Sequence, residues 1–248
     1  MTTLNGTELK GHDTLVVGGT GNVGFFLVDG FLRAGARVLV PSRSPQNLER
    51  LRSRLGAAAD RLVPVNGDIG TAEGAVQVQA QVRDLSSELF AVASAPASWH
   101  QSHSMLQAGF AEFKHVIETR LYPHFLAAEA LLPLIALGGS YTTINGPAGF
   151  ISPPPPGIGA IAVAAAAQNK LIEAIAAETA GTPRVNDVVM KAFLGPNGTR
   201  PGSPLRGEQV GDFVAALAAG GTHVHNRTIQ LASPRQIDEA LAGNFALA

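Results

Sequence analysis

The sequence predicts an α/β protein built on a doubly wound parallel sheet. Its 248 residues suit one domain, since single hydrophobic cores stop growing only beyond ~250 residues. Short apolar runs alternate with longer amphipathic segments, a pattern typical of parallel βαβ units. A glycine-rich turn separates the first apolar run from the first amphipathic segment. We expect seven strands flanked by helices, with residues 1–248 forming a single domain without linkers or repeats.

Composition excludes several classes of protein. With 46% hydrophobic and 15% charged residues, the chain is neither disordered nor collagen-like. A net charge of -1 lacks the basic surplus of nucleic-acid-binding proteins, and the absence of cysteine excludes disulfides and zinc-thiolate sites. Residues 1–13 are polar, and no uninterrupted apolar run reaches ~18 residues. We therefore expect a soluble, cytoplasmic protein that binds neither nucleic acid nor membranes.

The first half of the chain alternates regularly between strand and helix patterns. Residues 14–17 are β-branched and apolar, so they predict a strand that ends at the glycine turn. The amphipathic stretch 25–34 predicts a helix closed by Gly35. The same reasoning predicts strands at 37–40, 61–65 and 89–93 and helices at 45–55 and 71–85.

The second half contains longer helices. Residues 104–137 predict one long helix, interrupted at Pro123 and Pro133 and ended by Gly138. Four consecutive prolines at 153–156 require an extended loop. The remaining predicted elements are strands at 140–144, 184–190 and 227–231, helices at 158–180 and 208–219, and a short polar cap at 195–207.

The glycine turn carries the first functional signal. Gly18, Gly21 and Gly24 lie between a predicted strand and helix, where glycines allow a tight turn and close approach of a pyrophosphate. The helix start, with Asn22 and Val23, offers free N–H groups to phosphates. This pattern predicts a Rossmann-type NAD(P) site. A glycine turn without a ligand is the alternative.

The end of the second strand indicates which cofactor binds. Folds that use NAD usually place a carboxylate there, against the ribose hydroxyls. Here Ser42 and Arg43 follow Pro41, and an arginine suits a 2'-phosphate. The sequence therefore favours NADP(H). A solvated surface arginine is the alternative reading.

The order of elements and several motifs resemble the short-chain dehydrogenase/reductase family over nearly the whole chain. Residues 139–144 are similar to its fifth strand, and residues 184–186 to its Arg-Val-Asn segment. The resemblance implies that Asp68, with Ile69 beside it, binds the adenine. It also implies that Ser94 lies beside the cofactor after the fourth strand.

The family's catalytic residues are not matched. Family members use a serine, a tyrosine and a lysine, with an asparagine on the long helix in a proton relay. The resemblance places Gly146 at the serine, Ala166 at the tyrosine and Arg120 at the asparagine, and keeps only Lys170, which then holds the nicotinamide ribose. Alanine cannot transfer a proton, so the family's standard mechanism is not expected here.

Other side chains are candidates for the missing proton donor. His100 follows the fourth strand, at the edge where ligands of such sheets bind, and an imidazole exchanges protons near neutral pH. Tyr141 is the second candidate, although tyrosines on a strand more often serve as packing residues. No metal site is expected, because His223 and His225 have no third ligand nearby in the sequence.

Three functions fit these features. The first is an atypical NADP(H)-dependent oxidoreductase whose substrate is unknown and whose proton comes from water or a substitute side chain. The second is an NADP(H)-binding sensor without turnover. The third is a cyclase, isomerase or lyase on the same fold. The resemblance further implies a homodimer or homotetramer formed through helices 104–137 and 158–180.

Overall fold

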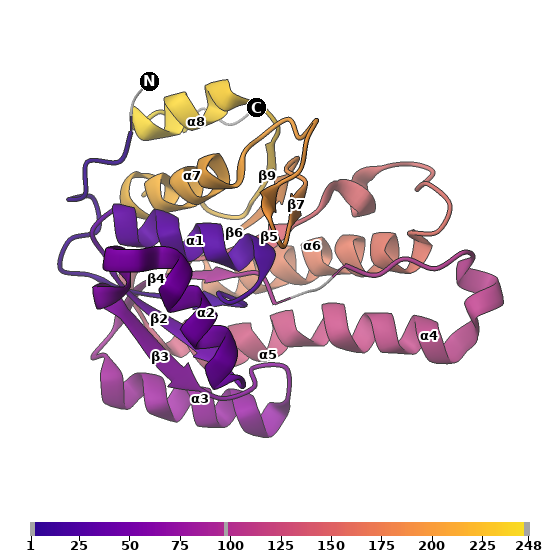
Figure 1. Ribbon diagram of the computed structural model, residues 1–248, viewed down its shortest axis with the longest axis horizontal. Helices are drawn as coiled ribbons and strands as arrows, with labels where there is room; N and C mark the ends of the chain where they lie inside the picture. Colours follow the sequence, from indigo (N-terminus) through magenta and orange to yellow (C-terminus); the bar gives the residue numbers. More distant parts are fainter. Residues whose placement is uncertain (1–2, 97–98, 246–248) are drawn as a thin grey trace.

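A seven-stranded parallel sheet forms the centre of the protein, shown as a computed structural model that describes residues 3–96 and 99–245 (Figure 1). The strand order is β3-β2-β1-β4-β5-β6-β9, and every neighbouring pair is parallel. The strands are β1 (Asp13–Val17), β2 (Arg37–Ser42), β3 (Leu62–Asn66), β4 (Leu89–Ser94), β5 (Ile135–Asn145), β6 (Arg184–Met190) and β9 (Arg227–Leu231). The predicted fold class is confirmed.

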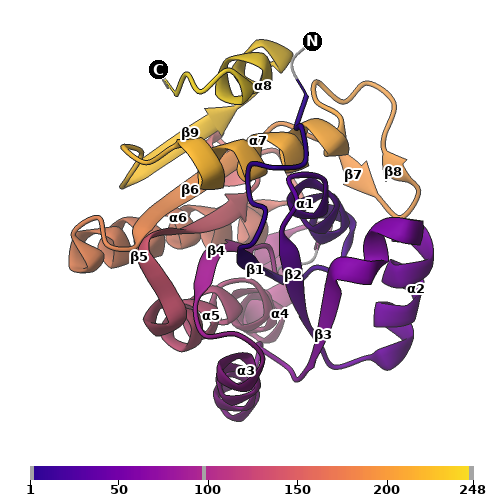
Figure 2. The ribbon, with the colours of Figure 1, turned by 90° about the vertical axis from the view of Figure 1, so that its left-hand side faces the viewer.

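Helices cover both faces of the sheet (Figure 2). One face packs against α1 (Asn22–Arg33), α2 (Pro45–Leu55), α7 (Gly207–Gly220) and α8 (Pro234–Leu241). The other packs against α3 (Ala72–Leu85), α5 (Tyr122–Leu131) and α6 (Gly159–Thr179). The remaining helical segment, α4 (Met105–Arg120), is broken at Gly109, whose φ is 83°, and precedes α5. These two apolar layers supply the core that fixes the strand ends, where the candidate site lies.

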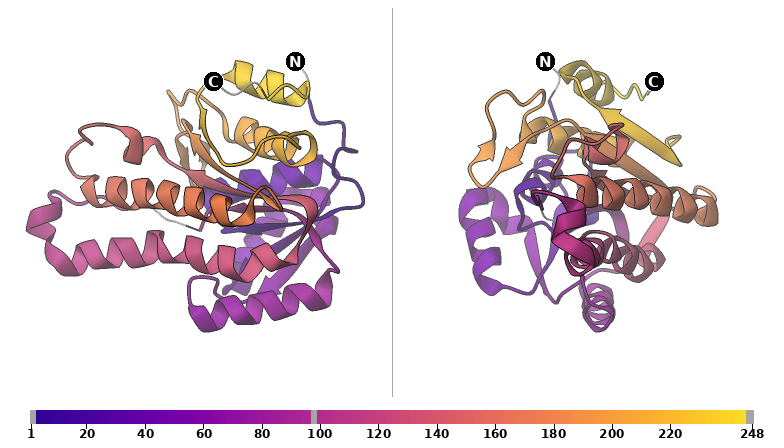
Figure 3. Two further views of the ribbon diagram at one scale, coloured as in Figure 1. Left: turned by 180° about the vertical axis from the view of Figure 1, so that it is seen from behind. Right: turned by 90° about the vertical axis from the view of Figure 1, so that its right-hand side faces the viewer.

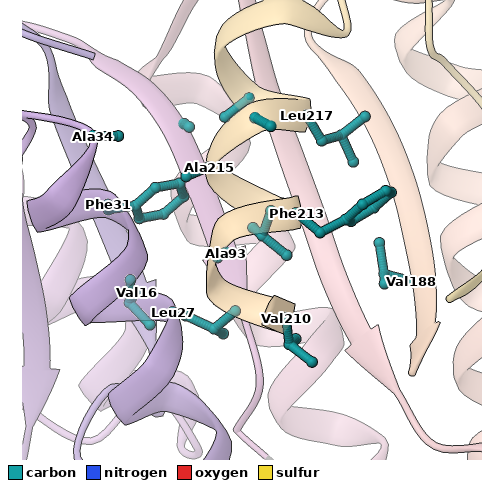
Figure 4. Packing of buried hydrophobic residues seen from close by; sticks show 14 of the residues in the cluster. Val16, Leu27, Phe31, Ala34, Ala93, Val188, Val210, Phe213, Ala215 and Leu217 are labelled. Atoms are coloured by element: carbon teal, nitrogen blue, oxygen red, sulfur yellow. The ribbon is translucent and has the colours of Figure 1, made fainter. Parts of the chain in front are cut away.

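The packing of α1 and α7 onto the sheet shows how closely the layers fit (Figure 4). Phe31 of α1 and Phe213 of α7 are almost fully buried between the helices and the sheet. The two helices touch through glycines, because a Cβ on Gly30 would lie 2.4 Å from the carbonyl oxygen of Gly211. Small residues at this crossing therefore set the position of α1, whose start forms part of the site.

The predicted long helix differs from the structure in its boundaries. α4 ends at Arg120, and Pro123 stands in the first turn of α5, where its missing N–H is tolerated. Helical structure stops at the short 3-10 turn Leu132–Leu134, which contains Pro133, so β5 already begins at Ile135. Gly138 has a positive φ of 82° inside the irregular start of this strand and does not end a helix.

A short strand pair and the last helix were not expected. β7 (Leu194–Gly195) and β8 (Gly198–Thr199) form an antiparallel pair within the predicted polar cap. The last helix, α8, starts with Pro234 in its first turn, and Ser233 and Gln236 form a capping box. Its Ser-Pro start is a recognisable sequence signal. The helix covers α7 with Ile237 and Ala240.

α4 and the first half of α6 lie side by side and extend beyond the sheet (Figure 3). The loop before α4 is tied to the loop before α6, since Ser102 N–H donates to the carbonyl oxygen of Gly157 at 3.0 Å. α6 is long and apolar enough to cross a membrane, but half of its most apolar 18-residue stretch is buried inside the protein. This identifies α6 as a helix of the core.

Candidate nucleotide site at the carboxyl edge

The carboxyl ends of β1 and β4 define the centre of the site. These strands are neighbours, and Val17 pairs with Ser94 where both end. The chain leaves β1 toward α1 on one face of the sheet and leaves β4 toward α5 on the other. Ligands of open α/β sheets bind at such a switch point, because the diverging connections leave a crevice there.

The glycines of the turn after β1 are required by close backbone contacts. Gly18 has a φ of +74°, and a Cβ there would lie 2.3 Å from the carbonyl oxygen of Ala95. A Cβ on Gly24 would lie 2.0 Å from the carbonyl oxygen of Gly18. Gly21 is less confined, since its Cβ would meet that same oxygen at 3.2 Å. The turn is therefore folded tightly beneath the start of α1, as a phosphate cradle requires.

The start of α1 is free to receive an anion. Gly21 is the N-cap, and in the described structure no side chain caps the helix and no acidic residue stands in its first turn. Asn22 is exposed and Val23 half-buried. The first N–H groups and the helix dipole thus point to the crevice without a competing side chain, which fits the pyrophosphate of a dinucleotide.

Arg43 and Asp68, both predicted to bind cofactor, lie together across the ends of β2 and β3. Arg43 Nη1 donates to Asp68 Oδ2 at 2.9 Å, with the arginine 78% exposed. The other oxygen of Asp68 accepts from Gly70 N–H at 3.0 Å. Ser42 and Ile69 are buried beside them. The pair gives this edge a fixed carboxylate and an arginine whose exposed end is available to a phosphate.

Ser94 and Tyr141 lie beneath the site rather than in it. Both are fully buried, and their hydroxyls lie beside each other with no further hydrogen-bond partner among the described residues. Burial raises the pKa of Tyr141 well above its ordinary value. A phenol in this position does not exchange protons with a ligand at the edge, so its placement supports the packing role and not the catalytic one.

His100 lies in the loop between β4 and α4, next to α4. Its Nε2 is 3.0 Å from Glu112 Oε1 of α4, and both side chains are about one-third exposed (30% and 37%). A carboxylate partner fixes the orientation of the imidazole. The structure thus places His100 against α4 and not against the glycine turn.

A buried carboxylate, which the sequence reasoning missed, supports the end of β5. Asp187 is 1% exposed, and both of its oxygens accept hydrogen bonds from side chains of β5 and α6. The donors are Thr143 (2.7 Å), Asn145 (3.0 Å), Gln168 (3.2 Å) and Asn169 (3.2 Å). The available signal was an aspartate directly before the apolar run 188–190 of a predicted strand. The network fixes the loop that follows β5.

Comparison with known proteins identifies the family. The family model for short chain dehydrogenases matches residues 13–194. The chain belongs to the short-chain dehydrogenase/reductase family. Among curated relatives, cis-2,3-dihydrobiphenyl-2,3-diol dehydrogenase of Metapseudomonas furukawaii is 31% identical over 208 residues, which cover 81% of this chain and 69% of that protein. Cis-1,2-dihydrobenzene-1,2-diol dehydrogenase of Pseudomonas putida is 28% identical over 196 residues, covering 76% and 68% of the two chains.

Solved structures show the same short-chain dehydrogenase fold. A dehydrogenase/reductase from Sinorhizobium meliloti superposes with a TM-score of 0.80 at 20% identity, over 92% of this chain and 96% of that one. The NADP active-site complex of RhlG from Pseudomonas aeruginosa gives a TM-score of 0.78 at 22% identity, over 91% and 96%. The family and its nicotinamide-nucleotide-binding fold are thus established for this chain.

In this short-chain dehydrogenase, the side of α6 that faces the end of β5 carries no titratable group among the described residues. Asn145 Nδ2 donates to the carbonyl oxygen of Ala165 at 2.9 Å, and Ile161 packs one turn earlier. Ala166 and Lys170 lie on the outward face, where Lys170 is 78% exposed and paired with Glu173. This placement does not bring Lys170 to the site. Gly146 follows Asn145, and a Cβ there would meet no atom within 4 Å.

Proposed function

We propose that the protein is an NADP(H)-dependent oxidoreductase that transfers a hydride between the cofactor and a ring carbon that carries oxygen. The observation that carries this proposal is the tight glycine turn at the start of α1 together with Arg43 after β2, whose carboxylate partner, Asp68, follows β3 and not β2. The nicotinamide supplies the hydride chemistry when bound. The backbone N–H groups of Asn22 and Val23 would hold the pyrophosphate, and Asp68 the adenosine end.

The proton that accompanies hydride transfer must leave or reach the substrate oxygen without a tyrosine. The two tyrosines of the chain are the exposed Tyr122, at the start of α5, and the fully buried Tyr141. Water at the open edge is the simplest carrier, and His100 with Glu112 is the side-chain alternative. Loss of a general acid or base typically costs 10²- to 10⁴-fold in rate, so positioning of cofactor and substrate has to supply the remaining acceleration.

Apolar side chains around the edge favour an apolar, cyclic substrate. The segments after β4, β5 and β6 each carry an exposed aromatic residue: Trp99 (67%), Phe150 (39%) and Phe193 (50%). Aromatic side chains that stay exposed near a ligand site are suited to cover an apolar ligand. The curated relatives act on dihydrodiols of benzene, toluene and biphenyl rings, which are substrates of this kind.

Replacing Arg43 tests the choice of cofactor. We expect NADPH to bind wild type at least tenfold more tightly than NADH, a difference of ~1.4 kcal/mol that one charge-assisted contact supplies. Arg43→Ala should remove this preference and leave NADH binding unchanged. Calorimetry with both cofactors measures it, with Arg50→Ala on the exposed side of α2 as the control. Equal affinities of wild type for the two cofactors would overturn the NADP(H) assignment.

A cofactor-binding protein without turnover is the second candidate function. The observation that favours it is the α6 surface at the end of β5, where Ile161 and Ala165 present no group able to move a proton. Such a protein would bind NADPH but oxidise it with no carbonyl or quinone. NADPH oxidation over a broad substrate panel distinguishes the two candidates, and any His100-dependent turnover decides for the enzyme.

We further propose a homodimer or homotetramer, formed in the cytoplasm through α4, α5 and α6. Their outer surface carries exposed apolar residues, namely Leu106 (85%), Phe110 (77%), Tyr122 (52%), Phe125 (50%) and Val163 (44%). A two-fold contact pairs one such surface with itself. Light scattering at micromolar concentration should give a multiple of the 25.6 kDa chain mass.

The variant Phe110→Glu should shift that mass toward the monomer, because it places a charge in the apolar contact. Val76→Glu on α3, which alters an equally exposed apolar residue (67%) on another surface, is the matched control and should leave the mass unchanged. A monomeric wild type would contradict the proposed assembly.

A further inference from the structure

Arg120 is a partly buried cation without a counter-ion. Among the described residues, no carboxylate lies within ion-pair distance of Arg120 and no acceptor receives its Nε–H, although that nitrogen is fully buried. Burial alone lowers its pKa, with no acidic neighbour to oppose the effect. Removing a guanidinium from water is costly unless an anion pairs with it. The fold therefore holds a charge that nothing in the described chain neutralises.

Arg120 lies close to the carboxyl edge of the sheet, on the face that α5 covers. Arg120 continues the buried stripe of α5, which consists of His124, Ala127, Ala128 and Leu131. Ala127 and Ala128 pack in one cluster with Val17 of β1 and Val92 of β4. The stripe thus runs beneath the two strands whose ends form the crevice.

The start of α5 lies level with the strand ends. A Cβ on Gly70, in the loop after β3, would lie 3.9 Å from Pro123 Cγ. Arg120 precedes Pro123 by three residues, which is about 4.5 Å of helix axis, so it lies just outside the edge of the sheet. The arginine is half-buried and its Nε fully buried, so its outer nitrogens are the part that reaches solvent.

His124, the buried residue next to Arg120 on the same helical face, supplies no negative charge to the guanidinium. It is fully buried one turn after Arg120, and neither ring nitrogen has a partner among the described residues. Burial and the charge of Arg120 lower the pKa of His124 to about 3, so the imidazole is neutral at physiological pH. A neutral ring does not compensate the guanidinium, and an anion has to come from outside the described chain.

We propose that Arg120 binds an anionic oxygen group, a carboxylate or a phosphate, of a ligand held in the crevice between the ends of β1 and β4. A guanidinium fits either group through two parallel N–H···O hydrogen bonds. A ring substrate with a carboxylate would supply one source, and the phosphates of the nucleotide the other. This proposal rests on the proposed function for where the ligand lies. The negative charge of the ligand follows from Arg120 alone.

Two binding measurements separate the sources. Calorimetry on the protein without cofactor compares benzoate with its neutral analogue benzamide, and a second titration measures NADH. If a substrate carboxylate is the partner, wild type binds benzoate at least tenfold more tightly than benzamide and Arg120→Gln removes that preference. If a nucleotide phosphate is the partner, Arg120→Gln instead lowers the affinity for NADH at least tenfold. Arg120→Lys, which keeps the charge, restores part of either loss.

Stability provides an independent readout that a purely structural arginine would not give. Without ligand, Arg120→Met should raise the melting temperature by several degrees, because it removes an unpaired buried charge and keeps an apolar stem. Arg83→Gln, which removes an exposed arginine of α3, is the control and should change neither binding nor stability.

Two results would overturn the proposal: an Arg120→Gln protein that binds benzoate, benzamide and NADH as wild type does, or an Arg120→Met protein that is several degrees less stable than wild type. Failure of NADPH to bind would refute the proposed function instead, while the benzoate comparison still reports on Arg120.

Discussion

The Gly24→Ala protein is expected to lose nucleotide binding, with an affinity for NADPH lowered at least 100-fold. A methyl group at this position would stand 2.0 Å from the carbonyl oxygen of Gly18, and this contact lies between two backbone segments. A side chain can rotate away from a clash, but here α1 has to move off the turn. The N–H groups at the start of α1 then no longer converge on one phosphate position, and their summed electrostatic attraction is lost.

Gly21→Ala is the matched control for this prediction. It adds the same methyl group in the same motif, but the nearest atom lies at 3.2 Å and the φ of Gly21 is -85°. We expect it to weaken NADPH binding by less than tenfold. Thermal unfolding of both variants shows how much of each effect is lost stability, since overpacking typically costs 1–3 kcal/mol. Similar NADPH affinities of Gly24→Ala and wild type would mean that the turn does not hold the phosphates.

The sequence was sufficient for the fold because its signals are local. Alternation of short apolar runs with amphipathic helices indicates a parallel sheet, and the glycine turn marks the strand end at which such a sheet binds a nucleotide. Boundaries were less accurate where two signals compete. Proline and glycine are both common helix-ending signals, so Pro133 and Gly138 give two possible ends. Only the pairing of β5 with β4 determines that the strand already includes Gly138.

The chemistry of the site depends on three-dimensional relations that a single sequence does not state. Lys170 is the lysine of α6, yet which of its residues face β5 depends on the rotation of the helix about its axis. Hydrogen bonds from Asn145 to Ala165 and from Gln168 to Ile144 fix that rotation, and they turn Lys170 outward. Ala165, which faces β5, and the exposed Lys170 are five residues apart, and five residues turn a side chain about the helix axis by about 140°. A small error in aligning the helix with the family pattern therefore changes the predicted role of a residue completely.

Asp187→Asn is expected to destabilise the folded protein by about 3 kcal/mol at pH 7, within the range for breaking a buried, fully hydrogen-bonded charge. The substitution keeps the shape but places an amide NH₂ where the carboxylate accepts hydrogen bonds. Asn145 is then unable to adapt by turning over its amide. Its oxygen accepts from Gly146 N–H at 2.9 Å, and its Nδ2 donates to the carbonyl oxygen of Ala165 at 2.9 Å. Denaturant unfolding measures the loss, with exposed Asp60→Asn as the control.

The pH dependence of that loss follows from the pKa of Asp187. Burial raises this pKa above its ordinary value of about 3.9, against the opposing effect of four side-chain hydrogen bonds, of which that from Asn145 is the largest. A carboxyl group with a raised pKa stabilises the fold most when protonated. Its contribution is fully present below pH ~3.9 and is lost as the pH rises through the folded-state value. The stability difference between wild type and Asp187→Asn should therefore shrink between pH 4 and pH 7.

The Asp60→Asn control replaces a carboxyl that is exposed in the folded protein. A difference that instead grows with pH would mean that the hydrogen bonds to Asp187 outweigh its burial and hold its pKa below the ordinary value. Asn145 donates to Asp187 and accepts from Gly146 N–H, so the network holds the chain at the end of β5. The Asp187→Asn protein should therefore also bind NADPH more weakly than the Asp60→Asn protein does. Unchanged NADPH affinity in a destabilised Asp187→Asn protein would separate the end of β5 from the cofactor site.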